Sequence, residues 1–309
     1  MADKIKLNHP WLVAVWPGMG HVALNAGYYL LSKLDMAVLA ELDAGELFDI
    51  DHVEVKEGLI EPARRPRNRF FVWNDPDKRR DLVVFLGEAQ PPIGRYPFCK
   101  QLVSFAKEIG IERVLTFAAM ATRMHPEDRS RVFGAATNDD NVQELKRLEL
   151  ELLEEGHIGG LNGVLLGAAA EAGLHGACFL GEMPHVFAQL PFPKASLAVL
   201  ETFTTIFHID IDFTELTEQA KASEEQLTEL MARVEEVYGR ARNNEDEEML
   251  PEPSEAKEIT ATDRRRIEAL FDQAGKDRSK AFELKRELDR LNVFKEYEDR
   301  FLDLFKKPG

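Results

Sequence analysis

The chain reads WLVAVWPGMGHVALNAGYYLLSKLDMAVLAEL from residue 11 to residue 42, and this stretch decides the fold. Trp11 to Trp16 is a continuous apolar run ended by a Pro-Gly pair, which is typical of a strand buried on both faces. Apolar residues recur at helical spacing from His21 to Leu34, and Met36 to Leu42 then predicts a second strand. The stretch therefore predicts a β-α-β unit.

The same alternation continues along the chain. Further buried strands are predicted at Phe70 to Trp73, Leu82 to Leu86, Val114 to Ala118 and Ala177 to Leu180. Amphipathic helices are predicted at Pro97 to Ile109, Asn141 to Glu155 and Pro193 to Phe207. Because parallel strands need crossover connections, this order predicts an α/β fold with a mainly parallel sheet and helices on both faces.

The character of the sequence changes after Phe213, so we predict an α/β domain at residues 1–213 and a charged helical extension at residues 214–309. Within the extension, residues 243–258 are acidic, contain two prolines and lack aromatic residues, which predicts a flexible linker. Residues 262–307 carry Phe and Leu among charged residues and predict two or three amphipathic helices. Their apolar stripe can meet either their own domain or a partner.

Composition narrows the range of partners and compartments. The 309 residues include 55 acidic and 39 basic side chains, and the net charge of -16 repels phosphate backbones and anionic lipids. Nucleic acid and membranes are therefore not expected partners. Two cysteines far apart in sequence, an N-terminus without an apolar signal segment and no run of about 20 apolar residues together predict a cytoplasmic protein.

A glycine-rich turn begins at Gly18 and reads GMGHVA. It matches G-x-G-x-x-G/A, follows a predicted strand, opens a helix, and precedes Glu41 and Asp43 by about the spacing of a dinucleotide fingerprint. Gly18 and Gly20 could let the backbone approach a pyrophosphate. The alternative is that the glycines only allow a tight strand-to-helix turn.

A second polar run follows the strand ending at Leu86 and contains Glu88, Arg95 and Tyr96. Polar residues just beyond the carboxyl end of a strand are where ligands bind in open α/β sheets. Glu88 could act as an acid or base, and Arg95, with Tyr96 beside it, could bind a carboxylate or phosphate. The alternative is that Glu88 and Arg95 pair with each other or with a neighbouring subunit.

A third candidate is the glycine-rich run HIGGLNGVLLG, residues 157–167, which precedes the strand ending in LGEMP. Many small residues allow close approach of backbones and could form a pocket floor or a subunit interface. Asn162 and Glu182 are the polar candidates here. The alternative is that Gly and Ala only let this helix lie flat on the sheet.

Signatures of catalysis are absent from the sequence: it has no G-x-S-x-G, Walker, H-E-x-x-H or C-x-x-C motif. The eight histidines do not form pairs at ligand spacing. We therefore expect no catalytic residue, no metal site and no cofactor.

These motifs, taken in order, resemble the proteasome assembly chaperone 2 family over about residues 11–216. The resemblance rests on the Pro-Gly turn after a Trp-bearing strand, the GRYP run at residues 94–97, RVFGAAT at residues 131–137, the glycines of residues 156–167 and LGEMP at residues 180–184. The helical tail is similar to that of the bacterial branch of the family.

The resemblance implies a three-layer α/β/α sandwich with a mixed, mainly parallel sheet, similar to phosphorylase/hydrolase folds, followed by a C-terminal helical extension. It also implies a non-enzymatic chaperone that forms homo-oligomers and contacts proteasome α subunits or another protein client. Several family members dock through a C-terminal hydrophobic-Tyr-any tripeptide, whereas this sequence has Lys307-Pro308-Gly309, a departure that argues against that docking mechanism and against the proteasome as the client.

A second hypothesis is a small-molecule or nucleotide-binding enzyme, ligase-like or phosphorylase-like, that uses the crevice at the carboxyl ends of the strands. Its pocket candidates are Gly18, Gly20, Glu88, Arg95, Asn162 and Glu182. Phosphorylase-like folds support such chemistry, but a fold does not by itself imply a function.

Overall fold

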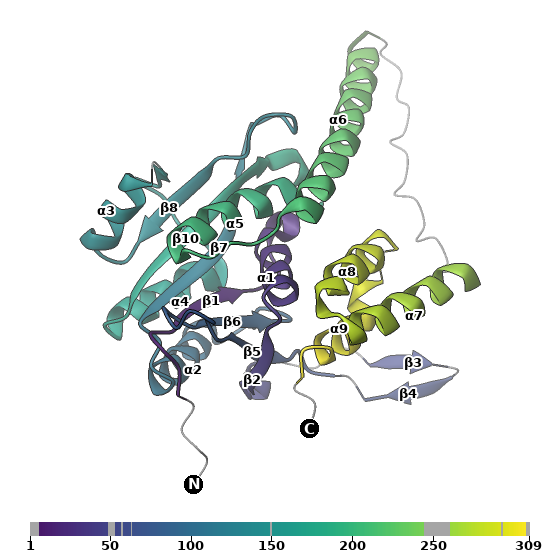
Figure 1. Cartoon of the computed structure of the whole chain (residues 1–309). Coiled ribbons are helices and arrows are strands. Elements are labelled where there is room, and N and C mark those ends of the chain that lie inside the picture. The colour runs from purple at the N-terminus through teal and green to yellow at the C-terminus, as the bar shows by residue number, and fades with distance from the viewer. Residues whose placement is uncertain are drawn as a thin grey trace.

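A computed structural model describes residues 6–48, 53–56, 58–62, 64–148, 150–243, 260–291 and 293–306. Its central feature is a sheet of eight strands in the order β2-β5-β6-β1-β7-β10-β8-β9 (Figure 1). The strands are β1 (Trp11–Val15), β2 (Ala37–Glu41), β5 (Asn68–Trp73), β6 (Leu82–Gly87), β7 (Arg113–Thr122), β8 (Val132–Ala136), β9 (Glu151–Leu152) and β10 (His175–Pro184). A separate hairpin is formed by β3 (Glu54–Lys56) and β4 (Leu59–Glu61).

The sheet is parallel at its centre and mixed at its margins. β6, β1, β7 and β10 are parallel neighbours, whereas β5 is antiparallel to both β2 and β6, and β8 is antiparallel to β10. The short edge strand β9 pairs in parallel with β8. The predicted mixed, mainly parallel sheet is confirmed.

Helices cover both faces of the sheet, because alternate side chains of each strand point to opposite sides. Trp11, Val13 and Val15 of β1 pack into one core with α1 (Val22–Lys33) and α5 (Pro193–Phe207). Leu12, Ala14 and Trp16 pack into the other core with α2 (Arg95–Glu108) and α4 (Gly160–Glu171). The three-layer sandwich is therefore confirmed, with both faces of its central strand buried.

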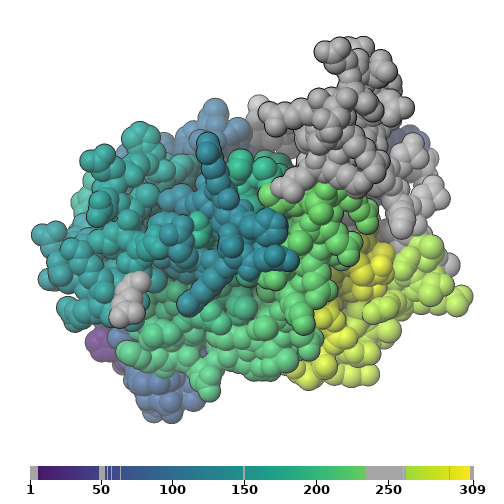
Figure 2. Space-filling view, turned by 90° about the horizontal axis from the view of Figure 1, so that it is seen from above, coloured from purple at the N-terminus to yellow at the C-terminus, as the bar shows by residue number. Residues whose placement is uncertain are grey.

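The C-terminal helices pack against the α1 side of the sandwich. They are α6 (Thr214–Asn243), α7 (Ala261–Lys276), α8 (Ala281–Arg290) and α9 (Phe294–Asp303). Apolar side chains of α7, α8 and α9 belong to the same buried core as those of α1, and Figures 1 and 2 show these helices against the body of the molecule. The boundary at residue 213 stays a prediction, and the linker predicted at residues 243–258 lies, apart from Asn243, outside the described residues.

One predicted helix is wrong in length. The helix predicted from Asn141 to Glu155 is α3 (Asp139–Arg147), and the chain then enters β9. Asn138 caps its start by accepting a hydrogen bond from the Asn141 N–H. After α3, the N–H of Leu153 donates to the carbonyl of Gly134 in β8, so pairing with the sheet replaces helical hydrogen bonds in a leucine-rich segment that suits either structure.

None of the helices within the described parts of the chain is long and apolar enough to cross a membrane.

Candidate functional site

A crevice opens outside the carboxyl ends of β1, β7 and β10, and we call it the β1/β7 crevice. Its volume is about 570 Å³, within the range of small-molecule pockets. It lies between the glycine-rich turn after β1 and the start of α4. Its lining consists of Trp16, Gly18, Met19, Ala23, Gln90, Ala118, Ala119, Met120, Ala121, Leu153, Gly156, His157, Ile158, Gly159, Gly160, Asn162 and Leu180.

Two of the predicted site residues, Gly18 and Asn162, line the β1/β7 crevice. Gly20 lies in the same turn with φ 61°, and a Cβ there would come within 2.7 Å of the Met183 sulfur. Glycine at this position is therefore required by backbone conformation and packing. The other predicted residues lie outside the lining of this crevice.

The backbone of the glycine-rich turn does not offer a cradle for a pyrophosphate. The N–H of Gly20 donates to the carbonyl of Ala188 at 2.9 Å, and the N–H of His21 donates to the carbonyl of Gly18 at 3.1 Å. The next N–H, of Val22, donates to the carbonyl of Met19. Three successive donors are thus already used, which favours the tight-turn interpretation over dinucleotide binding.

Glu88 lies in an arginine cluster formed by Arg64, Arg67 and Arg69. Its carboxylate accepts hydrogen bonds from the side chains of Arg64 and Arg69 and from the N–H of Arg67, each at 2.9 Å. Glu88 therefore pairs with these arginines and not with Arg95. Arg64 and Arg69 also donate hydrogen bonds to the carboxylate of Asp299 in α9, at 2.9 Å and 2.5 Å. The C-terminal helix α9 therefore contacts the arginine cluster directly.

The electrostatics of this cluster follow from its burial. Glu88 is 3% exposed, and burial raises the pKa of its carboxyl, an effect to which the nearby Glu298 adds. On the exposed side, Arg67 binds Glu41 at 2.8 Å and lowers the pKa of that carboxyl through its hydrogen bond. Glu41, one of the two acidic residues at the spacing of a dinucleotide fingerprint, is therefore part of an ion pair.

Arg95 and Tyr96 begin α2 on the opposite face of the sheet from the tail. Both are exposed, and the Tyr96 hydroxyl donates to the carboxylate of Glu171 at the end of α4. Arg95 has no hydrogen-bond or ion-pair partner among the residues that the structure describes. This pair of side chains thus belongs to the outer surface of α2.

Glu182 lies near the end of β10 and is buried. Arg131 donates two hydrogen bonds to its carboxylate, both at 2.7 Å, and the Thr122 hydroxyl donates a third at 2.8 Å. These hydrogen bonds, chiefly those from Arg131, hold the pKa of Glu182 below its ordinary value. Arg131 also binds the exposed Glu151 of β9 at 2.8 Å. Glu182 of β10 and Glu151 of the edge strand β9 are therefore linked through the same arginine.

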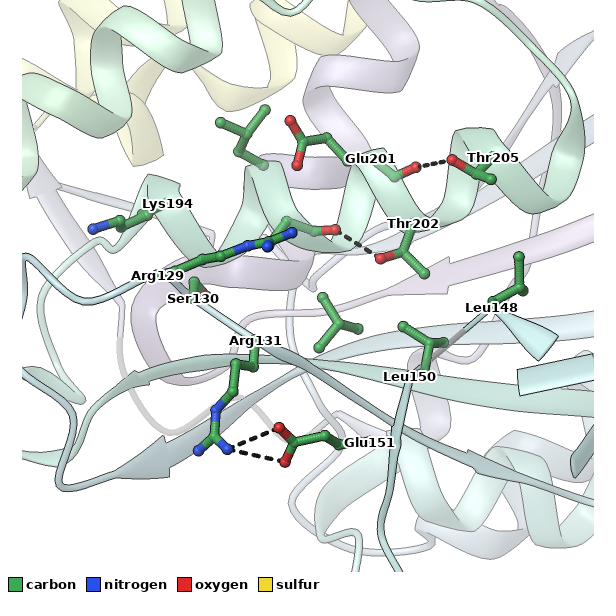
Figure 3. A pocket seen from close by; sticks show the side chains of 13 residues that line it. Arg129, Ser130, Arg131, Leu148, Leu150, Glu151, Lys194, Glu201, Thr202 and Thr205 are labelled. Atoms are coloured by element: carbon green, nitrogen blue, oxygen red, sulfur yellow. Dashed lines mark hydrogen bonds and ion pairs between the residues drawn. The ribbon is translucent and has the colours of Figure 1, made fainter. Parts of the chain in front are cut away.

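A second groove of about 580 Å³ lies between α5 and the β8–β9 edge (Figure 3). Figure 3 shows the Arg131–Glu151 pair on its strand side, across from Thr202 and Thr205 of α5. Both threonine hydroxyls donate to carbonyls of their own helix. Lys194 binds Glu224 at 2.5 Å, so most polar groups of this groove already have partners.

Sequence reasoning missed several residues at these sites. Gln90 lies in the polar run after β6, and its amide joins the Pro17 carbonyl at 3.0 Å to the Leu161 N–H at 3.2 Å. It therefore fixes the start of α4 against the end of β1. A basic run before the strand predicted at Phe70 to Trp73 contains the arginines at positions 64, 67 and 69, and the sequence shows this run. Their partner Asp299 is 230 residues away from Arg69, so the sequence does not show that contact.

Comparisons with known proteins agree on one family. The sequence profile of the PAC2 family matches residues 12–231. A similar structure is that of PbaB from Pyrococcus furiosus, an archaeal proteasome activator, with a TM-score of 0.63 at 29% identity, covering 73% of this chain and 94% of PbaB. PbaA of the same organism, an archaeal homolog of proteasome-assembly chaperone, has a TM-score of 0.58 at 25% identity, covering 77% and 94%.

A curated relative adds to this comparison. An uncharacterized protein of Methanocaldococcus jannaschii, MJ1210, is 28% identical over 243 residues, which covers 78% of this chain and 90% of the relative. The helices α7, α8 and α9 lie beyond the segment that the family profile matches.

Proposed function

Because the chain belongs to the PAC2 family, we propose that it acts as a proteasome-assembly-chaperone-like protein through protein-protein interaction, without catalysis. The observation that carries the proposal is the likeness to PbaB, which extends over 94% of that proteasome activator at 29% identity. The proposed partners are proteasome α subunits or another protein client, together with further copies of this chain. The relatives reported above are archaeal, and membership in the bacterial branch stays a prediction.

The chemistry of the molecule supports this function. Among the described residues, His157 is the one ionisable side chain in the lining of the β1/β7 crevice, and the buried Glu88 and Glu182 are both engaged by arginines. The hairpin β3–β4 presents Val55, Leu59 and Ile60 with 63%, 72% and 72% of their surface exposed. Exposed apolar groups of this kind are typical of interaction surfaces, which supports self-association or client contact. The cytoplasmic location is part of the proposal.

The test uses the full chain and purified α subunits of the 20S proteasome from the same organism. The chain is mixed with unassembled α subunits, and complex size is followed by size-exclusion chromatography with light scattering. A second arm mixes it with assembled 20S particles and measures peptidase activity. We expect a complex with unassembled α subunits and faster formation of α rings.

The two arms separate two kinds of proteasome function. Higher peptidase activity of assembled particles without any effect on assembly would replace the chaperone proposal with an activator function. Absence of binding in both arms would contradict proteasome involvement. The chain alone, run on the same column, reports its own oligomeric state, and a monomer at all concentrations would contradict the proposed homo-oligomer.

A further inference from the structure

The β3–β4 hairpin has no core of its own. Val55 and Ile60 lie directly opposite each other in the ladder and form one face, and they are 63% and 72% exposed. Every other hairpin residue whose burial the structure describes is exposed as well. A two-stranded hairpin is at best marginally stable in water unless another strand or helix covers its apolar face. The described parts of the chain do not cover this face, so we expect its cover to come from another molecule.

The groove between α5 and the β8–β9 edge, which we call the α5/β8 groove, offers such a cover. Its apolar lining is only partly buried and consists of Leu148, Leu150, Leu197 and Ala198, together with the buried Val132. β9 is the last strand of the sheet, so one of its sides has no strand neighbour within the described chain. An edge strand beside an apolar groove is an arrangement to which a strand of another molecule can add.

The charges of the two surfaces have opposite net sign. The lining of the groove contains three basic and two acidic side chains, namely Arg129, Arg131, Lys194, Glu151 and Glu201. Arg131 and Lys194 already bind carboxylates, whereas Arg129 and Glu201 have no ion-pair partner among the described residues. The hairpin sequence VEVKEGLIE, residues 53–61, has three glutamates and one lysine, a net charge of -2. An acidic apolar segment therefore fits this groove better than a basic one.

The two surfaces lie at opposite margins of the sheet. The hairpin belongs to the connection between β2 and β5, which form one margin, and the groove lies beside β8 and β9 at the other. Figure 1 shows the hairpin below α9 on one side of the molecule and α3 with β8 on the other. Eight strands about 4.8 Å apart separate the margins by roughly 30 Å. The hairpin of one protomer is thus placed to contact the groove of another copy and not its own.

We propose that the β3–β4 hairpin of one copy of this chain docks in the α5/β8 groove of the next copy. The face of Val55 and Ile60 packs on the leucines of the groove, one hairpin strand adds to the free side of β9, and the acidic end of the hairpin lies near Arg129. Because two different surfaces at opposite margins meet, the contact is head-to-tail and closes into a ring of at least three subunits. The inference rests on the proposed homo-oligomerisation and names its two surfaces.

The experiment measures the mass of the full-length protein by size-exclusion chromatography with light scattering, without any proteasome subunit. Ile60→Asp places a charge on the hairpin face, and Thr202→Trp fills the groove from α5, where Thr202 belongs to the lining. Each variant should be a monomer at concentrations at which the wild type is a ring. Arg129→Glu should weaken assembly at least tenfold, because it removes the unpaired cation of the groove.

Two controls have substitutions of the same kind outside both surfaces. Val186→Asp changes an apolar side chain that is 57% exposed, and Arg95→Glu reverses an exposed arginine on the outer surface of α2. Both should keep the mass of the wild type. The melting temperature of each variant checks its fold, and Arg129→Glu takes the place of Thr202→Trp if the tryptophan lowers that temperature.

Mixing the two monomeric variants tests the head-to-tail contact itself. Ile60→Asp keeps an intact groove, and Thr202→Trp keeps an intact hairpin. An equal mixture should therefore form a one-to-one dimer that does not grow further, because only one productive contact remains. A chain that carries both substitutions should pair with neither variant.

Ring-sized particles that persist in both Ile60→Asp and Thr202→Trp would overturn this interface and leave the proposed function standing. A mixture of folded variants that stays monomeric would overturn it as well. A wild-type chain that is a monomer at all concentrations would contradict this interface and the proposed homo-oligomer together.

Discussion

Glu88 and Glu182 are both buried against arginines, yet their pKa values move in opposite directions. Burial dominates at Glu88 and raises the pKa of its carboxyl, with Glu298 acting in the same direction. At Glu182 the hydrogen bonds from Arg131 dominate and lower the pKa. The folded structure thus favours the ionised form of Glu182 and disfavours the ionised form of Glu88.

This difference predicts the pH dependence of stability for Glu182→Gln. A carboxyl with a lowered folded-state pKa contributes stability that is present above its unfolded value and is lost as pH falls through the folded value. We expect the variant to lose about 2 kcal/mol of unfolding free energy at pH 7, since it loses charge-assisted hydrogen bonds to a buried group. The gap between wild type and variant should shrink as the pH is lowered toward 4 and below, measured by urea unfolding.

The matched control is Glu151→Gln, because Glu151 binds the same Arg131 but is exposed. Exposed pairs contribute little, so this variant should lose less than about 1 kcal/mol. Equal losses in the two variants, or a gap for Glu182→Gln that does not change with pH, would contradict the assignment of the stabilisation to the buried carboxylate.

At the scale of elements, α4 shows how glycines in one helix differ. A Cβ at Gly163 would lie 2.0 Å from the carbonyl oxygen of Ile158, whereas a Cβ at Gly167 would meet nothing within 4 Å. The first glycine therefore allows the glycine-rich loop to pass close to the helix. The second has no packing reason to be glycine.

These geometries predict opposite effects of the same substitution. Gly163→Ala should destabilise the protein by about 2 kcal/mol or more, since a backbone oxygen must move. Gly167→Ala should stabilise it by about 0.5–1 kcal/mol, because alanine loses less conformational entropy in a helix. Thermal and urea unfolding of the two variants measure this, and a loss at both positions would show that α4 tolerates no added methyl group.

At the scale of the whole molecule, the C-terminal tail is part of the main core. Phe301 of α9 is fully buried and packs edge-on against Tyr28 of α1, with ring centroids 5.6 Å apart. The Tyr28 hydroxyl donates to Glu298 at 2.8 Å, and the carbonyl of Phe305 accepts from Val38 of the edge strand β2. The tail thus covers both α1 and one margin of the sheet.

Phe301→Ala should therefore cost about 3–5 kcal/mol, the usual range for a buried phenylalanine. We also expect faster hydrogen exchange in α8 and α9 than in β1 or β7, because the substitution loosens the tail first. The control is Leu230→Ala on α6, where the side chain is 41% exposed. If Phe301→Ala loses no more stability than this control, the tail is not held by the shared core.

Most of the layer architecture could be predicted from local pattern. Runs such as residues 11–16 and 82–86 are apolar without alternation, which indicates strands buried on both faces, and the intervening helices have the 3.6-residue period. The end of α3 could not be predicted, because the leucines that follow it at positions 148, 150, 152 and 153 suit both helical and strand packing. Only the position of β8 beside the segment decides in favour of β9.

The sequence by itself determined the α/β class, the buried central strands and the amphipathic tail. These depend on periodicity and backbone sterics, which act over a few residues. The tertiary structure alone decided that Glu88 pairs with arginines under α9, that the tail packs on α1, and that Gly18 and Asn162 meet in one crevice. Those contacts join residues far apart in the chain, and their energies depend on burial that exists only after folding.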